Sequence, residues 1–197
     1  GKVTGGTRYA DDLFLPRMLY GKLLRSRLPH ARLVRVDIST AAALPGVVAV
    51  MTGADLPHPY SIMPVNQDEH ALAIDKVRYV GDPIAAVAAV DEETAEAALH
   101  HIEVEYAPLR SLMSIDEALA YPDDRIHAYN RVGNVHRVVA LEFGDVDEGF
   151  GQADYIREDT FFFQGNTHIP MEQHAAVAQY TADGHLTLWS ATQTPHY

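Results

Sequence analysis

The sequence predicts a fold that mixes strands and helices, of the α/β or α+β class, organised around the stretch from Lys76 to Leu109. Two observations support this prediction. The run Ile84–Val90 is entirely apolar, as expected of a strand that is covered on both faces. Apolar residues then recur at helical spacing from Ala95 to Ile102, and at a spacing of two from Ile102 to Tyr106. The stretch therefore predicts two extended segments, a helix and a further strand.

Turn and cap residues mark the boundaries of these elements. Gly81, Asp82 and Pro83 interrupt the chain before the apolar strand, because glycine frees the backbone torsions and proline fixes its own φ. Asp91 is a favourable N-cap residue. We therefore expect a helix that begins just after Asp91 and lays its apolar face on a sheet.

The N-terminal part of the chain predicts a loop followed by two strands. The polar, glycine-containing residues Thr4–Thr7 favour a loop. Strands are predicted at Leu19–Ser26 and Leu33–Ile38, and Pro29 indicates the turn between them.

A short helix and another strand follow. Ser39 is predicted to cap an alanine-rich helix over residues 40–44. Pro45 and Gly46 end this helix, and the apolar run Val47–Met51 predicts a strand.

The two strand–helix–strand stretches resemble each other weakly in sequence. VDISTAAAL at Val36–Leu44 parallels VDEETAEAAL at Val90–Leu99. Either caps and helix formers recur by chance, or the chain contains a duplicated pair of units. Between them, Thr52–Ala73 shows little periodicity, so we expect a long surface loop with at most one turn of helix near Ala54.

The composition changes after Leu109, which predicts a domain boundary. Residues 114–120 predict a short helix, and Tyr121–Arg131 predicts a polar linker. We therefore place one domain at residues 1–131 and the start of a second at residues 132–197.

The second domain is predicted to contain strands and one helix. Asp145, followed three residues later by Glu148, is typical of a capping box for a helix that runs to Ala153. The other predicted elements are a strand at Val135–Phe143, an extended segment at Tyr155–Phe163, and a hairpin of Ala175–Tyr180 and Leu186–Ala191 around Asp183 and Gly184. Exposed apolar strand ends near Trp189 and Tyr197 predict self-association, so we expect an oligomer.

Composition excludes several classes of function. The chain has 27 acidic and 15 basic residues, a net charge of −12, so it offers no overall attraction for nucleic acid. It contains no cysteine, and it can therefore form no disulfide and hold no iron–sulfur cluster by itself. Its longest apolar runs fall far short of the roughly 20 residues that cross a bilayer. We expect no signal peptide and no membrane partner.

No self-contained active site is evident from motifs. His100 and His101 are adjacent on the predicted helix and point in different directions, which does not suit one metal ion. His168 and His174, with Glu172 between them, match no zinc or facial-triad spacing, and a structural role is favoured over a site. Nucleophile-elbow and phosphate-loop motifs are also missing from the sequence.

Five segments, in order along the chain, carry a resemblance to a known family. They are KVTGGTRYADD from Lys2, LLRSRLPHARLVRVDIS from Leu23, ALPGVVAVMTGADLP from Ala43, VRYVGDPIAAVAAVDEETAEAALHHIEVEYAPL from Val77 and FGDVDEGFGQADYIREDTF from Phe143. The chain resembles the N-terminal part of the molybdenum-binding large subunit of the xanthine dehydrogenase and aldehyde oxidase family. Among the branches of this family, which include carbon monoxide dehydrogenase, it looks most similar to the α subunit of 4-hydroxybenzoyl-CoA reductase.

The resemblance implies a fold and a set of cofactors. Residues up to Arg131 would form an α+β domain called the a/b hammerhead, with a mixed sheet and short helices, and residues 132–197 would begin an α+β molybdopterin-binding domain. The complete cytoplasmic enzyme would carry molybdenum on molybdopterin in its cytosine dinucleotide form. The [2Fe–2S] clusters and FAD would lie in partner subunits or in other parts of the polypeptide.

The resemblance also implies site residues. The family's pocket contains a glutamine just upstream of a stretch like HFYLETH, which matches HIPMEQH at His168–His174. Without gaps this glutamine falls on Asn166, whereas Gln164 lies two residues earlier. Gln164, Gly165 and Asn166 are therefore the expected cofactor contacts. The family's catalytic glutamate and glycine-rich cofactor loops are expected beyond Tyr197, so we expect no catalytic or metal-ligating residue here.

Two functions follow from these inferences. The first is the N-terminal portion of a molybdenum hydroxylase or dehydrogenase that acts, with iron–sulfur and FAD subunits, on an aromatic, heterocyclic, aldehyde or aryl-CoA substrate. This portion would be inactive alone. The alternative is a stand-alone, non-catalytic docking or assembly module.

Overall fold

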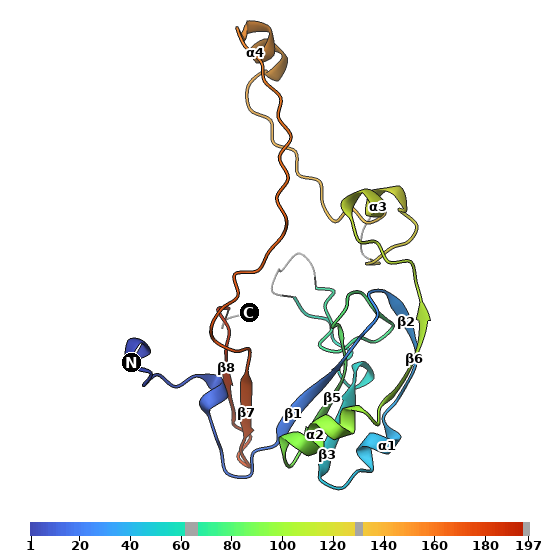
Figure 1. The fold of residues 1–197 in the computed structure, drawn as a ribbon, viewed down its shortest axis with the longest axis vertical. Helices are drawn as coiled ribbons and strands as arrows, with labels where there is room; N and C mark the ends of the chain where they lie inside the picture. The colour runs from blue at the N-terminus through green and yellow to red at the C-terminus, as the bar shows by residue number, and fades with distance from the viewer. Residues whose placement is uncertain (62–66, 129–131, 195–197) are drawn as a thin grey trace. The chain divides into compact units, whose positions relative to one another are not determined.

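The computed structural model describes residues 1–61, 67–128 and 132–194, which form two compact units (Figure 1). The two-sheet unit comprises residues 14–136 and Thr194. The hairpin unit joins residues 1–13 to residues 137–193. The predicted domain boundary at Arg131 lies outside the described residues and stays a prediction.

Two three-stranded antiparallel sheets build the two-sheet unit (Figure 1). The first has the order β1 (Tyr20–Arg25), β5 (Pro83–Ala89), β3 (Val47–Thr52), and the second has the order β4 (Lys76–Val77), β2 (Ala31–Asp37), β6 (Glu103–Pro108). The helical elements are α1 (Ser39–Ala42), η3 (Gly53–Asp55), α2 (Glu92–Leu99) and α3 (Ile115–Ala120). The α+β class and the predicted strands of this unit are thus confirmed.

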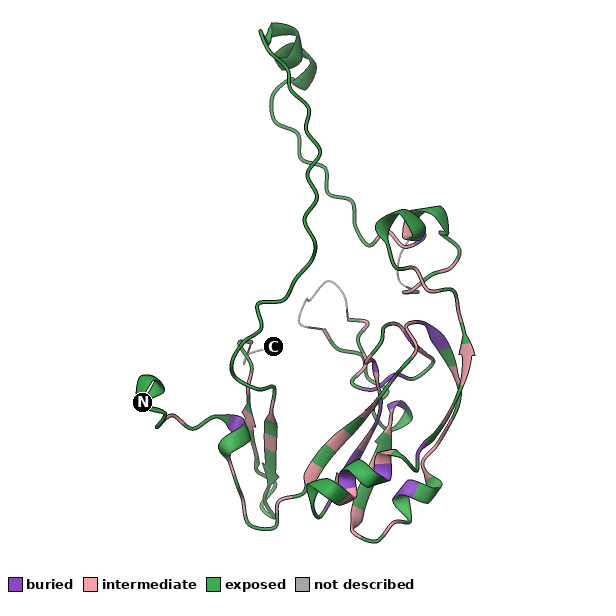
Figure 2. Ribbon diagram, viewed as in Figure 1, coloured by how far each residue is buried: buried purple, intermediate pink, exposed green. Residues whose placement is uncertain are grey.

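Strand β5 lies at the centre of the main core, which Figure 2 shows as a concentration of buried residues. One face of β5, formed by Ala85, Val87 and Ala89, packs against α2. The buried residues of α2 in this cluster are Ala95 and Ala98. On the other face, Ala86 and Ala88 are only half-buried. The prediction of a strand is confirmed, but its two faces are covered unequally, because α2 packs on one face and on the other only Ile84 is fully buried.

A second, smaller core lies under the other sheet. It consists of Ala31, Ala73, Val77 and Ile84. Ala73 belongs to the stretch predicted as a surface loop, and its neighbour Leu72 is also buried. The loop prediction is therefore wrong at its C-terminal end, where apolar side chains enter the core. The predicted turn near Ala54 is confirmed as η3, and residues 62–66 of this stretch lie outside the described residues.

Aspartate side chains precede both principal helices. The Asp91 Oδ1 atom accepts a hydrogen bond from the backbone N–H of Thr94 at 2.7 Å, which confirms the predicted N-cap of α2. The prediction that Ser39 caps the first helix is wrong, since Ser39 is the first residue of α1. Asp37 Oδ1 instead accepts the N–H of Ser39 at 2.9 Å. The earlier aspartate can reach this N–H because it stands just outside the helix.

The pairing of strands matches the weak sequence resemblance between the two halves of the unit. Strands β2 and β3 flank α1, whereas β5 and β6 flank α2. β2 pairs with β6 and β3 pairs with β5, both antiparallel. Each strand–helix–strand stretch therefore gives one strand to each sheet, and exchanging the stretches reproduces the same pairing. This correspondence favours a duplicated pair over chance recurrence.

The hairpin unit contains η1 (Lys2–Thr4), η2 (Ala10–Asp12), α4 (Val146–Gln152), β7 (Ala176–Tyr180) and β8 (Leu186–Ser190). The predicted hairpin is confirmed: β7 and β8 pair antiparallel, and Gly184 has a φ of 85° in the turn. The predicted cap of α4 is also confirmed, because Asp145 Oδ1 accepts the N–H of Glu148 at 2.9 Å. Among the described residues no helix has the length and apolar character needed to cross a membrane.

The predicted strand at Val135–Phe143 is wrong. Residues 137–143 have no regular secondary structure, and the side chains of Val138 and Phe143 are 81% and 85% exposed. A strand is held by hydrogen bonds to a neighbouring strand, and no described residue supplies a ladder here. The extended segment Tyr155–Phe163 likewise pairs with none of the described strands.

Candidate functional site

The residues predicted to contact a cofactor, Gln164, Gly165 and Asn166, lie in the hairpin unit. They belong to a stretch without regular secondary structure between α4 and β7, and all three are exposed. A Cβ atom built on Gly165 would meet no heavy atom within 4 Å, so the space around this residue is open. Their role as cofactor contacts stays a prediction.

The histidine pairs noted in the sequence do not assemble a metal site. His100 and His101 are exposed just after α2, and His168, Glu172 and His174 are exposed in the hairpin unit. Within residues 1–61, 67–128 and 132–194, no group of three His, Cys, Asp or Glu residues is placed to hold a metal ion.

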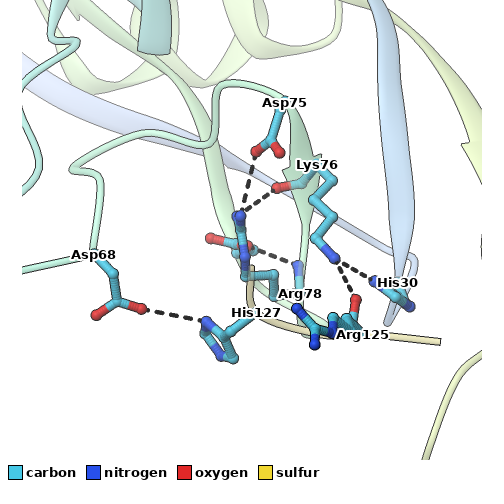
Figure 3. A network of polar contacts seen from close by, with 8 residues as sticks. His30, Asp68, Asp75, Lys76, Arg78, Arg125 and His127 are labelled. Atoms are coloured by element: carbon cyan, nitrogen blue, oxygen red, sulfur yellow. Dashed lines mark hydrogen bonds and ion pairs between the residues drawn. The ribbon is translucent and has the colours of Figure 1, made fainter. Parts of the chain in front are cut away.

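A cluster of charged and imidazole side chains lies in the two-sheet unit, beside a cleft of about 380 Å³ (Figure 3). The members of this polar cluster are His30, Asp68, Asp75, Lys76, Arg78, Asp82 and His127, together with the backbone carbonyl of Arg125. They come from the residue before β2, from β4, from the turn before β5, and from two connecting segments. Strand pairing therefore gathers residues that are far apart in the sequence.

The pairing of β2 with β4 positions the first two members. Arg32 lies opposite Lys76 and Ala31 lies opposite Val77 in the antiparallel register. Ala31 and Val77 are fully buried in the smaller core. Because these apolar residues fix the register, Lys76 is held beside His30, which immediately precedes β2.

His30 and Lys76 together bind two carbonyl groups of the segment that follows β6. His30 Nδ1 lies 2.7 Å from the Arg110 carbonyl oxygen, and its Nε2 lies 3.0 Å from Lys76 Nζ. Lys76 Nζ also donates to the carbonyl oxygen of Arg125 at 2.7 Å. Since a carbonyl only accepts and an ammonium only donates, the His30 ring is neutral, with its proton on Nδ1.

Burial shifts the titration of both groups in the same direction. Burial lowers the pKa of His30, although the hydrogen bond to the Arg110 carbonyl opposes this effect. Burial also lowers the pKa of Lys76, and the nearby charge of Arg78 adds to it. The neutral imidazole that Lys76 requires as an acceptor is therefore the favoured form.

Arg78 and Asp82 hold the turn that leads into β5. The backbone N–H of Arg78 donates to Asp82 Oδ2 at 2.9 Å. Its guanidinium donates to the Lys76 carbonyl at 3.1 Å and to Asp75 Oδ1 at 3.3 Å. Gly81 has a φ of 96° in this turn, a conformation that favours glycine. Burial raises the pKa of the Asp82 carboxyl, with the Arg78 N–H opposing the shift.

His127 closes the polar cluster on the cleft side. Its Nδ1 lies 3.3 Å from Asp68 Oδ2 (Figure 3). Burial lowers the pKa of His127, the positive charge of Arg78 lowers it further, and Asp68 raises it. His70 lines the same cleft, and its buried Nδ1 has no hydrogen-bond partner in the described part of the chain.

The arrangement fastens one connecting segment to the sheet at three points. The carbonyls of Arg110 and Arg125 and the side chain of His127 are all held by groups on the strands or on the loop before β4. The set contains no Ser, Thr or Cys nucleophile, and its one amine, Lys76, is held by His30 and by the Arg125 carbonyl, so the contacts support structure and positioning. Sequence reasoning missed the polar cluster, because its partners are separated by up to 80 positions and share no local motif.

Residues 4–110, more than half of the chain, match the family model described as the a/b hammerhead domain of aldehyde oxidase and xanthine dehydrogenase. The chain belongs to the aldehyde oxidase and xanthine dehydrogenase family. Residues 126–197 match a second model, the molybdopterin cofactor-binding domain. The resemblance found in the sequence is thereby confirmed, including its a/b hammerhead and the beginning of a cofactor-binding domain.

Relatives in the same family are similar to this chain along nearly its whole length. The chain is 40% identical to the nicotinate dehydrogenase large molybdopterin subunit of Eubacterium barkeri, over 100% of this chain and 45% of that protein. It is 34% identical to the carbon monoxide dehydrogenase large chain of Afipia carboxidovorans, over 98% of this chain and 26% of that protein. It is thus homologous to molybdenum-binding large subunits, and it spans less than half of their length.

A solved structure of the family has the same fold. Quinoline 2-oxidoreductase from Pseudomonas putida 86 superimposes with a TM-score of 0.83 at 34% sequence identity. The match covers 98% of this chain and 25% of that one.

Proposed function

We propose that the chain is the N-terminal portion of the large subunit of a molybdenum-dependent oxidoreductase. The observation that carries the proposal is the match of its last 72 residues, 126–197, to the molybdopterin cofactor-binding domain, following the a/b hammerhead match in sequence. This order also disfavours the alternative of a stand-alone docking module. The substrate class would be aromatic, heterocyclic, aldehyde or aryl-CoA, and a relation to 4-hydroxybenzoyl-CoA reductase remains part of this proposal.

The proposed cofactor is molybdopterin, in its cytosine dinucleotide form. The side-chain amides of Gln164 and Asn166 fit such a group in type, since each offers both donors and an acceptor. A Cβ atom built on Gly165 would meet no heavy atom within 4 Å, so the chain leaves room for a cofactor beside these two amides. When bound, the molybdenum cofactor would supply two-electron exchange with the substrate, and the amides of Gln164 and Asn166 would hold it by hydrogen bonds.

The remaining redox centres are proposed to reside elsewhere in a cytoplasmic, multi-subunit enzyme. Because this chain has no cysteine, the thiolates of [2Fe–2S] clusters must come from a partner subunit or another segment. FAD is assigned to a further subunit. The two-sheet unit then serves as scaffold, and the polar cluster fixes the segment that leads from it into the cofactor-binding part.

The test is to produce the full-length subunit together with its partner subunits and to measure molybdenum by mass spectrometry. We expect stoichiometric molybdenum and oxidation of an N-heterocycle, an aldehyde or an aryl-CoA with an artificial electron acceptor. The 197-residue chain alone should bind essentially no molybdenum. Tight, stoichiometric metal on this chain, or turnover by it alone, would contradict the scaffold assignment.

The same assay tests the predicted site residues. Asn166→Ala and Gln164→Ala should each lower kcat/KM by about ten- to a hundredfold, the equivalent of about 1.5–3 kcal/mol for a hydrogen bond to a charged group. Gln67→Ala, which removes an exposed amide from the two-sheet unit, is the matched control and should leave kcat/KM unchanged. Wild-type kinetics in both site variants would remove Gln164 and Asn166 from the cofactor site.

A further inference from the structure

One face of the β7–β8 hairpin is partly buried, although a two-stranded sheet cannot cover itself. In β8, Thr187 and Trp189 are half-buried and alternate with exposed residues, whereas in β7 only Val177 is half-buried. The half-buried residues are Ala175, Val177, Thr187, Trp189 and Ala191. Val177 lies directly opposite Trp189, so these side chains share one face of the hairpin. Something must lie over this face.

The N-terminal segment, residues 1–13, provides the cover. Its short helix η2 packs against β7, and the segment groups with the hairpin rather than with the two sheets (Figure 1). Ala10 of η2 is 9% exposed, the only buried residue among the described residues of the hairpin unit. Because η2 packs against β7, we attribute the burial of Ala10 and the partial burial of the hairpin face to the same contact.

Local hydrogen bonds give η2 a defined shape at this contact. The backbone N–H of Tyr9 donates to Asp12 Oδ2 at 2.9 Å, and the N–H of Asp12 donates to the Tyr9 carbonyl at 3.1 Å. These reciprocal bonds close the turn on both sides of Ala10. Helix η2 is therefore a locally ordered element of the N-terminal segment.

We propose that the N-terminal segment is a part of the cofactor-binding half of the subunit, where it covers the β7–β8 hairpin. The family match places residues 4–13 in the a/b hammerhead, whereas their contacts lie in the hairpin unit. The cofactor-binding half is then assembled from two segments, one on each side of the hammerhead in sequence. This inference rests on the proposed function, because it assigns the hairpin unit to cofactor binding.

The experiment uses the full-length subunit with its partners and compares Ala10→Glu with Val3→Glu. Both variants add one negative charge to the same segment, but Ala10 is buried and Val3 is 98% exposed. Hydrogen-exchange mass spectrometry should show faster exchange over residues 175–191 in Ala10→Glu, with β5 unchanged. Val3→Glu should alter neither region. No change over residues 175–191, or an equal change in β5, would overturn the proposal.

Two further measurements keep the outcome clear. If Ala10→Glu does not accumulate as folded protein, Asp12→Ala takes its place. This variant removes the acceptor for the Tyr9 N–H without burying a charge, and it should give a smaller increase in exchange over residues 175–191. In the 197-residue chain Trp189 is the only tryptophan, so its emission should move to longer wavelength in Ala10→Glu and not in Val3→Glu.

Molybdenum content separates this inference from the function on which it rests. Ala10→Glu should lower the molybdenum content of the full-length subunit, whereas Val3→Glu should retain it. A wild-type subunit without molybdenum would refute the proposed function. The hydrogen exchange over residues 175–191 would still test the contact between the N-terminal segment and the hairpin. Normal molybdenum in Ala10→Glu despite faster exchange over residues 175–191 would refute the role in the cofactor-binding half.

Discussion

Asn134 is a single side chain that ties together the whole turn after α3. Its Oδ1 accepts the N–H of Ile126 at 2.9 Å, and its Nδ2 lies 3.2, 3.3 and 3.4 Å from the carbonyls of Ala118, Tyr121 and Asp124. Asn134→Ala leaves these backbone groups without their partner, so it should destabilise this segment by about 1–3 kcal/mol. Hydrogen exchange of residues 118–126 measures the loss.

Asn166→Ala is the matched control for this prediction, because Asn166 is exposed in the hairpin unit. It removes the same amide and should leave exchange over residues 118–126 unchanged. Equal protection in Asn134→Ala and wild type would mean that other contacts hold the segment.

His30 makes stability depend on pH. Because burial lowers the pKa of His30 in the folded chain, the unfolded chain binds the proton more readily. The stabilisation is therefore complete above the ordinary pKa of about 6.5 and is lost as the pH falls below it. Denaturant unfolding of the 197-residue chain between pH 8 and pH 5.5 should show this decline. His127 has the same sign, since its pKa is also lowered, whereas the raised pKa of Asp82 gives the opposite sign.

His30→Gln isolates the contribution of this one residue. Glutamine does not titrate, so the decline in stability from pH 8 to pH 5.5 should become shallower. His100→Gln changes an exposed histidine and should keep the wild-type slope. An unchanged slope in His30→Gln would show that the titration of His30 does not control stability.

These residues could not have been found from the sequence. His30 and Lys76 are 46 positions apart, and Asn134 reaches back as far as 16 positions. The contact between His30 and Lys76 exists only after β2 and β4 have paired, and none of the three residues stands in a motif with a known spacing. Gln164 and Asn166 were predicted only through resemblance to the family, because an exposed amide carries no physical signal of its own.

At the scale of secondary structure, the N-cap of α2 offers a direct test. Asp91→Ala removes the acceptor for the Thr94 N–H and should lower the free energy of unfolding by about 0.5–2 kcal/mol. Asp91→Asn keeps a side-chain oxygen at the cap and should retain most of the stability. Denaturant titration of the two variants distinguishes them. An Asp91→Asn variant as unstable as Asp91→Ala would point to charge, and not to the cap, as the cause.

Elements with clear boundary residues and a core-facing pattern were predicted correctly, whereas the strand predicted at Val135–Phe143 was not. The helix after Asp91 and the strand at Ile84–Val90 combine boundary residues with burial, and both are confirmed. Val135–Phe143 has strand-forming residues, yet apart from an isolated bridge between Val135 and Val132 it has no pairing partner among the described residues. Strand propensity reflects packing against neighbours, so sequence alone cannot establish it where the neighbour is not local.

At the scale of the whole molecule, exposed aromatic side chains predict self-association. Phe161, Phe162 and Phe163 are 81–89% exposed, and such apolar runs favour contact between molecules. Light scattering of the 197-residue chain should therefore give a mass that rises with concentration. The sequence predicts exposed apolar strand ends near Trp189 and Tyr197. Trp189 is instead half-buried, and Tyr197 lies outside the described residues.

Replacing Phe161 and Phe163 by serine should reduce this rise. Phe14→Ser removes an exposed phenylalanine of the two-sheet unit and serves as the control. A concentration-independent monomer mass for the unaltered chain would contradict the prediction. If all the substitutions reduced self-association equally, the Phe161–Phe163 run would not be its specific cause.

The exchange of strands between the two halves of the two-sheet unit constrains how this unit can fold. Because β2 needs β6 and β3 needs β5, neither half can complete a sheet from its own residues. A polypeptide severed between Thr52 and Ala73 would yield two pieces that become ordered only by combining with each other. The two halves are thus interlocked, and cooperativity across the unit arises from its connectivity as well as from its hydrophobic interior.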